Sequence, residues 1–185
     1  MRYSSNHKAE TRRRIIGEAS RRFRKDGIEG TGLVPLMKAL GLTHGGFYAH
    51  FPSKDALVEA SLDAAAEQAL ERWPEPRDGE ELQAFVASYL SEQHRDNPDE
   101  GCALPTLSAE LGLRGAASAT SDAIVANMAK RVVNCDVRSP EDERGIVALA
   151  AMVGAITLAR AVSDPAESDR ILAAVRAAIR PAPER

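Results

Sequence analysis

The sequence predicts an all-α fold, and three observations support this prediction. Aromatic residues make up only 4% of the chain, while alanine, leucine and charged residues are abundant, a composition that favours helix. Apolar residues recur at helical spacing along most of the chain, and no segment alternates convincingly with the two-residue period of a strand. Residues that cap or end helices separate these periodic segments. The 185 residues suffice for one or two domains with a buried core.

The first helix is expected to begin near Lys8 or Ala9. It is expected to end at Gly27, because glycine readily adopts the left-handed conformation that terminates helices. One face of this segment is apolar at helical spacing and the other faces are rich in arginine, so the helix should bury a single stripe. The apolar residues are Ile15, Ile16, Ala19 and Phe23.

Two short helices joined by a tight turn are expected next. The first covers residues 33–40, where Pro35 falls in the first turn and removes no helical hydrogen bond. Gly41 makes the turn, and Thr43 is a good N-cap for a second short helix that extends to His50. Such a pair is typical of a helix-turn-helix module.

The remainder of the chain is expected to be helical as well. Ser53 is the expected N-cap of a long fourth helix over residues 54–73. Further helices are expected over residues 80–95, 103–113 and 121–134, over a strongly apolar segment at 140–162, and over a last segment at 168–180 capped by Ser168.

The charge distribution indicates a polyanionic partner at one end of the chain. The first 60 residues hold 11 Lys and Arg against 6 Asp and Glu, a net charge of +5. Because the whole chain carries −3, the remainder carries −8. A basic part joined to an acidic part suits a partner such as DNA, although an arginine-rich solvated helix would give the same charge.

The second short helix of the module has the side chains that a recognition helix needs. Between its apolar positions it offers short or hydrogen-bonding groups, and its glycines allow close approach to a groove. These exposed positions are Thr43, His44, Gly45, Tyr48 and His50.

Residues 41–57, GLTHGGFYAHFPSKDAL, resemble the signature of the tetracycline-repressor (TetR) family. The resemblance covers roughly residues 8–60. It implies an N-terminal three-helix DNA-binding domain over 1–60 and a helical ligand-binding and dimerisation domain over 61–185. It further implies a dimeric repressor that binds a double-stranded DNA operator and responds to an unknown small-molecule effector. Leu40, Pro35 and the tandem Gly45-Gly46 depart mildly from the family pattern.

Six candidate DNA contacts follow from the motif. The resemblance implies that Tyr48, His50 and Lys54 contact phosphates. Each has another interpretation: partial core packing for Tyr48, a contact within the fold for His50, and a solvated lysine for Lys54. The position of Thr43 at a helix N-terminus suits a phosphate. The candidates are Thr43, His44, Gly45, Tyr48, His50 and Lys54, of which His44 and Gly45 are the expected readers of base edges.

The resemblance also implies a ligand cavity in the second domain. Candidate lining residues are Phe85, Tyr89, His94, Cys102, Leu104, Leu107, Leu111 and Met128. For each of them, ordinary core packing is the alternative interpretation. Few basic residues lie between positions 80 and 128, so a small, largely hydrophobic effector is expected.

The penultimate helix is expected to form a dimer interface. It is apolar nearly all round, which the surface of a monomer would not tolerate. The expected interface comprises residues 146–162 and 171–179.

Several other function classes lack support in the sequence. It has no nucleophile–base pair, no metal-ligand spacing and no phosphate-binding loop, so we expect no enzyme activity, metal or cofactor. The absence of an apolar leader and the presence of only two cysteines favour the cytoplasm. The apolar stretch at 146–159 is shorter than the roughly 20 residues that span a bilayer, so we expect no membrane partner. Two alternatives remain: a repressor that senses oxidants or electrophiles through Cys102 or Cys135, and a nonspecific architectural DNA-binding protein.

Overall fold

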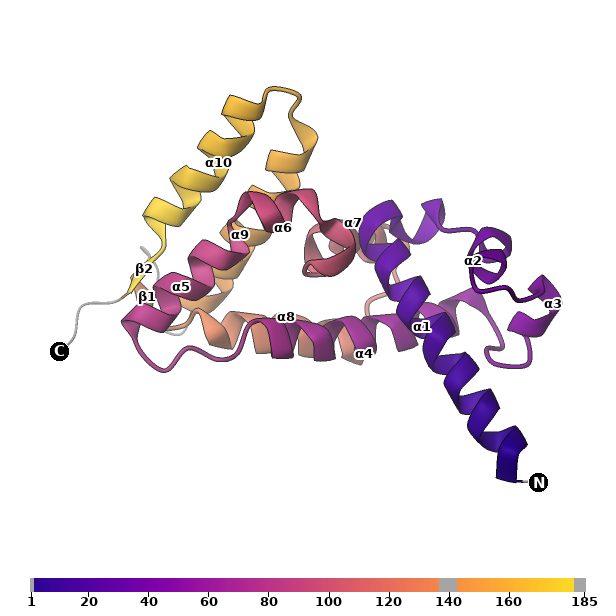
Figure 1. Cartoon of the computed structure of the whole chain (residues 1–185). Helices are drawn as coiled ribbons and strands as arrows, with labels where there is room; N and C mark the ends of the chain where they lie inside the picture. Colours follow the sequence, from indigo (N-terminus) through magenta and orange to yellow (C-terminus); the bar gives the residue numbers. More distant parts are fainter. Residues whose placement is uncertain (1, 137–142, 182–185) are drawn as a thin grey trace.

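The computed structural model describes residues 2–136 and 143–181. Within these ranges the chain is helical almost throughout, so the all-α prediction is confirmed (Figure 1). The exception is one antiparallel pair of two-residue strands, in which β1 (Cys135–Asp136) pairs with β2 (Arg180–Pro181).

The N-terminal module consists of α1 (Arg2–Gly30), α2 (Leu33–Ala39) and α3 (His44–Phe47). Helix α1 begins earlier than expected, because the residues before Lys8 include no glycine or proline that would break it. The expected interruption at Gly27 is present, since this residue has φ +77° and ψ 172° inside the segment. A short helical piece then continues to Gly30.

Helix α3 is shorter than expected and ends at Phe47 instead of His50. Thr43 caps it as predicted, with its hydroxyl accepting a hydrogen bond from the Gly46 amide. Gly45 and Gly46 have low helix propensity, so little favours a further turn of helix, and residues 48–50 form turns. The following helix is capped by Ser53, as predicted.

Helix α4 (Lys54–Arg72) connects the two halves of the molecule as one uninterrupted rod. It leaves the N-terminal module and runs beside α8 (Ala119–Arg131) through the second half (Figure 1). Trp73 is its C-cap residue. A helix of this length spans nearly 30 Å and is stiff.

The segment expected as one helix over 80–95 is two helices, α5 (Gly79–Tyr89) and α6 (Glu92–Asp96). The prediction of a single helix was wrong because Ser91 is an N-cap, whose hydroxyl accepts from the His94 amide. A 3-10 turn, η1 (Pro98–Glu100), leads into α7 (Leu104–Leu113).

Helices α9 (Arg144–Ala161) and α10 (Pro165–Ala178) pack against each other at the end opposite the N-terminal module (Figure 1). The expected start of α9 at Pro140 lies outside the described residues. Ser168 is not the cap of α10. Asp164 accepts from the Ala166 amide instead, while Ser168 is buried and donates to the Ala159 carbonyl at 2.7 Å.

By length and composition, α9 is apolar enough to cross a membrane, the one such helix in the described part of the chain. Its inward face packs on α6, α7, α8 and α10. We therefore interpret it as a core helix with one uncovered side.

Candidate nucleic-acid interface and ligand region

Helix α3 is anchored by one buried ring and presents its other positions outward. Phe47 is buried and stacks on Phe51 with ring centroids 5.7 Å apart. Thr43, His44 and Gly45 are exposed at the N-terminal end of the helix. The short helix therefore offers these three positions to a groove without disturbing the core.

Tyr48 follows directly after α3 and is 59% exposed. Its ring meets the edge of Phe47 at 5.2 Å and of His44 at 5.8 Å. The expected partial packing is therefore present, yet most of the side chain faces solvent. The structure brings His44 and Tyr48 together on one outward surface.

His50 lies half-buried where the module meets α1. Its Nδ1 is buried and has no hydrogen-bond partner among the described residues. Burial, followed by the positive charges of Lys8, Arg12 and His7, lowers the pKa of His50. The imidazole thus lies in a positive field that an anion would neutralise.

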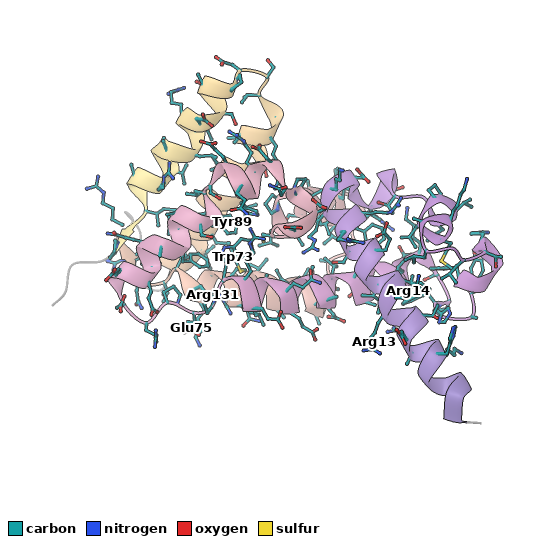
Figure 2. The ribbon with its side chains drawn as sticks, in the orientation of Figure 1. Arg13, Arg14, Trp73, Glu75, Tyr89 and Arg131 are labelled. Carbon is teal, nitrogen blue, oxygen red and sulfur yellow. The ribbon has the colours of Figure 1, made fainter. Side chains whose placement is uncertain are left out.

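Two arginines of α1 make contacts within the N-terminal module. The Arg12 guanidinium lies 4.7 Å from the centroid of the Phe51 ring, and Arg14 donates to the Leu40 carbonyl at the end of α2. Arg13 and Arg14 both lie on the part of α1 beside the module (Figure 2). Lys54, the first residue of α4, is half-buried.

The seven candidate ligand residues Phe85, Tyr89, His94, Cys102, Leu107, Leu111 and Met128 are all buried, and so is Leu104. The structure brings four of them together. The His94 ring lies 4.6 Å from that of Tyr89, and the Tyr89 ring stacks at 6.2 Å on that of Phe85. The Cys102 amide donates to His94 Nε2 at 3.0 Å. Leu107, Leu111 and Met128 belong to the general core.

His94 is held as a neutral imidazole. Nε2 accepts from the Cys102 amide, so the ring proton resides on Nδ1, which donates to the Tyr89 carbonyl at 2.6 Å. Burial lowers the pKa of His94 to about 4, and this effect outweighs the opposing one of the carbonyl acceptor. The residue therefore ties α5, α6 and the segment before α7 to one another.

A pocket of about 560 Å³ opens beside this cluster, between the end of α4 and α5. Of the seven candidates, only Phe85 lines it. Trp73 forms another part of the wall and is fixed by its indole NH, which donates to Ser88 at 3.3 Å, and by its carbonyl, which accepts from Arg131 at 2.8 Å. Trp73, Tyr89 and Arg131 lie close together in this region (Figure 2).

The thiol-sensing alternative is not favoured. Cys102 and Cys135 are both buried, and burial raises the pKa of Cys102. A buried neutral thiol is a poor nucleophile toward oxidants and electrophiles.

Helix α7 and its C-cap residue Arg114 make contacts with α1 and with the first turn of α4 that sequence reasoning missed. The Glu110 carboxylate accepts from the Ile28 amide at 2.6 Å, next to the interruption at Gly27. Thr106 donates to the Arg24 carbonyl at 2.7 Å, and Arg114 pairs with Asp55 at 2.5 Å. No local pattern identifies these pairs, because the two partners of each lie 82, 82 and 59 residues apart.

Residues 15–61 match the family model for bacterial regulatory proteins of the tetR family. Over 58 residues the chain is 43% identical to the HTH-type transcriptional regulator TtgR of Pseudomonas putida, a match that covers 31% of this chain and 28% of that relative. The chain thus aligns with less than a third of the length of this curated relative.

Solved structures extend the likeness to the whole fold. A TetR transcriptional regulator from Chloroflexus aurantiacus has 24% sequence identity and a TM-score of 0.73, covering 96% of this chain and 100% of that one. AibR in complex with isovaleryl coenzyme A and operator DNA has 18% identity and a TM-score of 0.58, covering 89% and 95%. The arrangement of the N-terminal helices and of the helical second half is therefore shared.

Proposed function

The chain belongs to the TetR family of bacterial regulatory proteins, and from this membership we propose that it is a dimeric repressor that binds a palindromic DNA operator. The observation that carries the proposal is the surface at α3, where Thr43, His44, Gly45 and Tyr48 are exposed around the buried Phe47. From the same membership we propose that the regulator is cytoplasmic and has no enzymatic activity.

Within this surface we assign separate roles. Tyr48, His50 and Lys54 contact phosphates, because they surround α3 and carry hydrogen-bonding or cationic groups. His44 and Gly45 read base edges from the start of α3. Thr43 uses its hydroxyl for the cap, which leaves the amides at the N-terminal end of α3 for a phosphate.

Dimerisation uses the outer side of α9 with the adjoining part of α10. Ile146 is 60% exposed and Leu158 is 57% exposed, and small apolar residues lie between them on the same side. Ile171 and Val175 of α10 are half-buried and remain partly accessible to a second copy. Leu172 and Ile179 are buried in the core of the subunit. A second copy would cover the uncovered apolar side.

We divide the chain functionally at about residue 60, with DNA binding in residues 1–60 and effector binding and dimerisation in residues 61–185. The boundary falls inside α4, so that helix belongs to both parts. An effector that tilts α4 would move the two N-terminal modules of a dimer relative to each other. The α7 contacts to Ile28, Arg24 and Asp55 offer a second mechanical connection.

Selection of bound genomic fragments tests the proposal. The purified chain is expected to enrich a small set of fragments that share one inverted repeat, and a His44→Ala variant should alter the preferred base at one position of each half-site. Recovery of fragments without a common sequence would support the nonspecific architectural alternative instead.

Reciprocal binding tests the effector response. Once an inducer is identified, saturating operator should weaken its binding by the factor by which the inducer weakens operator binding, about 5–150-fold. Trp73 is the only tryptophan and lines the pocket, so its emission reports the titration. Equal inducer affinity with and without operator would contradict the coupling.

A further inference from the structure

Two guanidinium groups, one from α1 and one from α9, bind backbone carbonyls and form no ion pair with a described carboxylate. Arg24 is only 3% exposed and donates to the carbonyls of Ser20 and Gly101, both at 3.2 Å. Arg160 donates to the carbonyls of Arg95 at 2.9 Å and His94 at 2.7 Å. Neither forms an ion pair within the described ranges. Buried charges are normally paired, whereas here the nearest carboxylates act only from beyond ion-pair distance, Asp99 and Glu100 on Arg24 and Asp96 on Arg160.

The positive charges of Arg24 and Arg160 reach one polar group in common. Both act on the Cys102 thiol, and that of Arg160 also acts on the Tyr89 hydroxyl. His94 connects the set, because its ring bonds the Tyr89 carbonyl and the Cys102 amide while its carbonyl accepts from Arg160. The cluster therefore combines α1, α5, α6 and α9 at one place.

Two donors of this cluster have no well-formed hydrogen bond. The Tyr89 hydroxyl and Nη1 of Arg160 are both buried without a partner of good geometry among the described residues, and the neighbour of the hydroxyl is the Cys102 thiol, a weak acceptor. Burial raises the pKa of Tyr89, so its hydroxyl keeps its proton, and desolvation lowers the pKa of Arg160. Two buried donors without a strong acceptor, beside guanidinium groups that form no ion pair, are complementary to an anion that accepts hydrogen bonds.

A pocket with an aromatic wall and charged residues of both signs, among them Arg77 and Glu81, adjoins this anion-complementary cluster. The Trp73 and Phe85 rings that line the 560 Å³ pocket pack against the Tyr89 ring, with centroids 5.2 Å and 6.2 Å away. Neither Tyr89 nor Arg160 lines this pocket, so a ligand in it reaches their donors only if Trp73 or Phe85 rotates.

We propose that the effector is an apolar carboxylic acid, whose carboxylate is held by the Tyr89 hydroxyl and Arg160 Nη1 and whose apolar part occupies the pocket at Trp73 and Phe85. This inference rests on the proposed function and names the chemistry of its effector. It also refines the expectation of a small, largely hydrophobic effector by adding a negative charge. That expectation counted basic residues only between positions 80 and 128, whereas Arg24 and Arg160 come from outside this range.

Matched pairs of compounds test the inference. Octanoate, decanoate and phenylacetate are each compared with their primary amide, using Trp73 emission and the thermal midpoint of the full-length protein. At least one carboxylate should bind about tenfold or more tightly than its amide, the difference expected for charge-assisted hydrogen bonds in a buried site.

Two variants identify the site. Tyr89→Phe removes only the hydroxyl and Arg160→Gln removes the charge, and each should weaken carboxylate binding by about tenfold while leaving amide binding within about twofold. Arg170→Gln, at an exposed arginine of α10, is the control and should bind like the unmodified chain. If Arg160→Gln fails to fold, Tyr89→Phe decides alone.

The outcomes separate the two proposals. Carboxylates that bind no better than amides, or no binding by either class, overturn the inference even if the protein selects its operator normally. Carboxylate binding that is unchanged in Tyr89→Phe also overturns it. Failure to select any DNA sequence in the same preparation contradicts the proposed function instead.

Discussion

His94 makes the second half of the molecule sensitive to acid. Its pKa is about 4 in the folded protein against about 6.5 in an unfolded chain, so its contribution to stability is complete above pH 6.5 and is lost as the pH falls toward 4. The shift corresponds to about 3 kcal/mol in the free energy of unfolding. Denaturant titrations at pH 7, 5.5 and 4.5 measure the decline.

The matched variant for this prediction is His94→Gln. It should be less stable at pH 7, because it disturbs the bonds to Tyr89 and Cys102, but its stability should fall less between pH 7 and 4.5. Parallel declines in the two proteins would show that other groups control the acid response.

At the DNA surface, two kinds of substitution should behave differently. Lys54→Ala and Tyr48→Phe should weaken binding to operator and random DNA by similar factors, because phosphate contacts carry no sequence information. Lys54→Ala should also reduce the slope of log affinity against log salt by about one. Fluorescence anisotropy over a salt series measures both effects, and a selective loss of operator binding in either variant would contradict the assigned roles.

His50 should couple DNA binding to proton uptake. Its pKa is lowered in the free protein by burial and by the charges of Lys8, Arg12 and His7, and a phosphate beside it would raise that pKa. Operator affinity should therefore increase as the pH falls below 7, and His50→Gln should remove most of this dependence. The same pH profile in both proteins would exclude His50 as the titrating group.

At the level of elements, the interruption of α1 couples the N-terminal module to α7. An added Cβ at Gly27 would lie 2.5 Å from Glu110 Oε1, and Gly27 has φ +77°. Gly27→Ala should therefore lower the free energy of unfolding by about 1–3 kcal/mol, through backbone strain and loss of the Glu110 contact to Ile28.

The chain offers a matched control in the same helix. Gly17 has nothing within 4 Å of an added Cβ, so Gly17→Ala should be neutral or stabilising by up to about 1 kcal/mol. Chemical denaturation of both variants gives the comparison. Equal effects would show that the Gly27 site has no special role.

Elements with strong local signals were predictable from the sequence. Thr43 and Ser53 cap helices as expected, and α4 has nearly the expected bounds. The errors arose where several residues compete for one role. Ser91 divides a long periodic segment, and Asp164 caps α10 because Pro165 fits the first helical turn, which leaves Ser168 inside the helix.

The ligand region was predictable only in part. Four of the candidates lie within 18 residues of one another, so one local segment of the sequence was enough to predict them as a group. They are Phe85, Tyr89, His94 and Cys102. Arg24 and Arg160 join them from α1 and α9 through tertiary packing. Such partners leave no signal in a single sequence, because nothing local distinguishes them from solvated arginines.

For the whole molecule, the outer side of α9 predicts an obligate dimer. Leu158→Asp places a charge on this side and should give a monomer with much weaker operator binding, since only one recognition helix would remain per particle. Leu113→Asp is the control, because Leu113 is also an exposed leucine, at 89% against 57% for Leu158, but lies on α7. Sedimentation at micromolar concentration distinguishes the species, and a dimeric Leu158→Asp protein would place the interface elsewhere.

The most direct test of the account is a hydroxyl-radical footprint of the dimer on its selected DNA site. We expect two-fold symmetric protection of an imperfect inverted repeat, with half-sites about 34–36 Å apart or somewhat more and two protomers bound per site. Protection without inverted symmetry, or full affinity from one protomer, would contradict it.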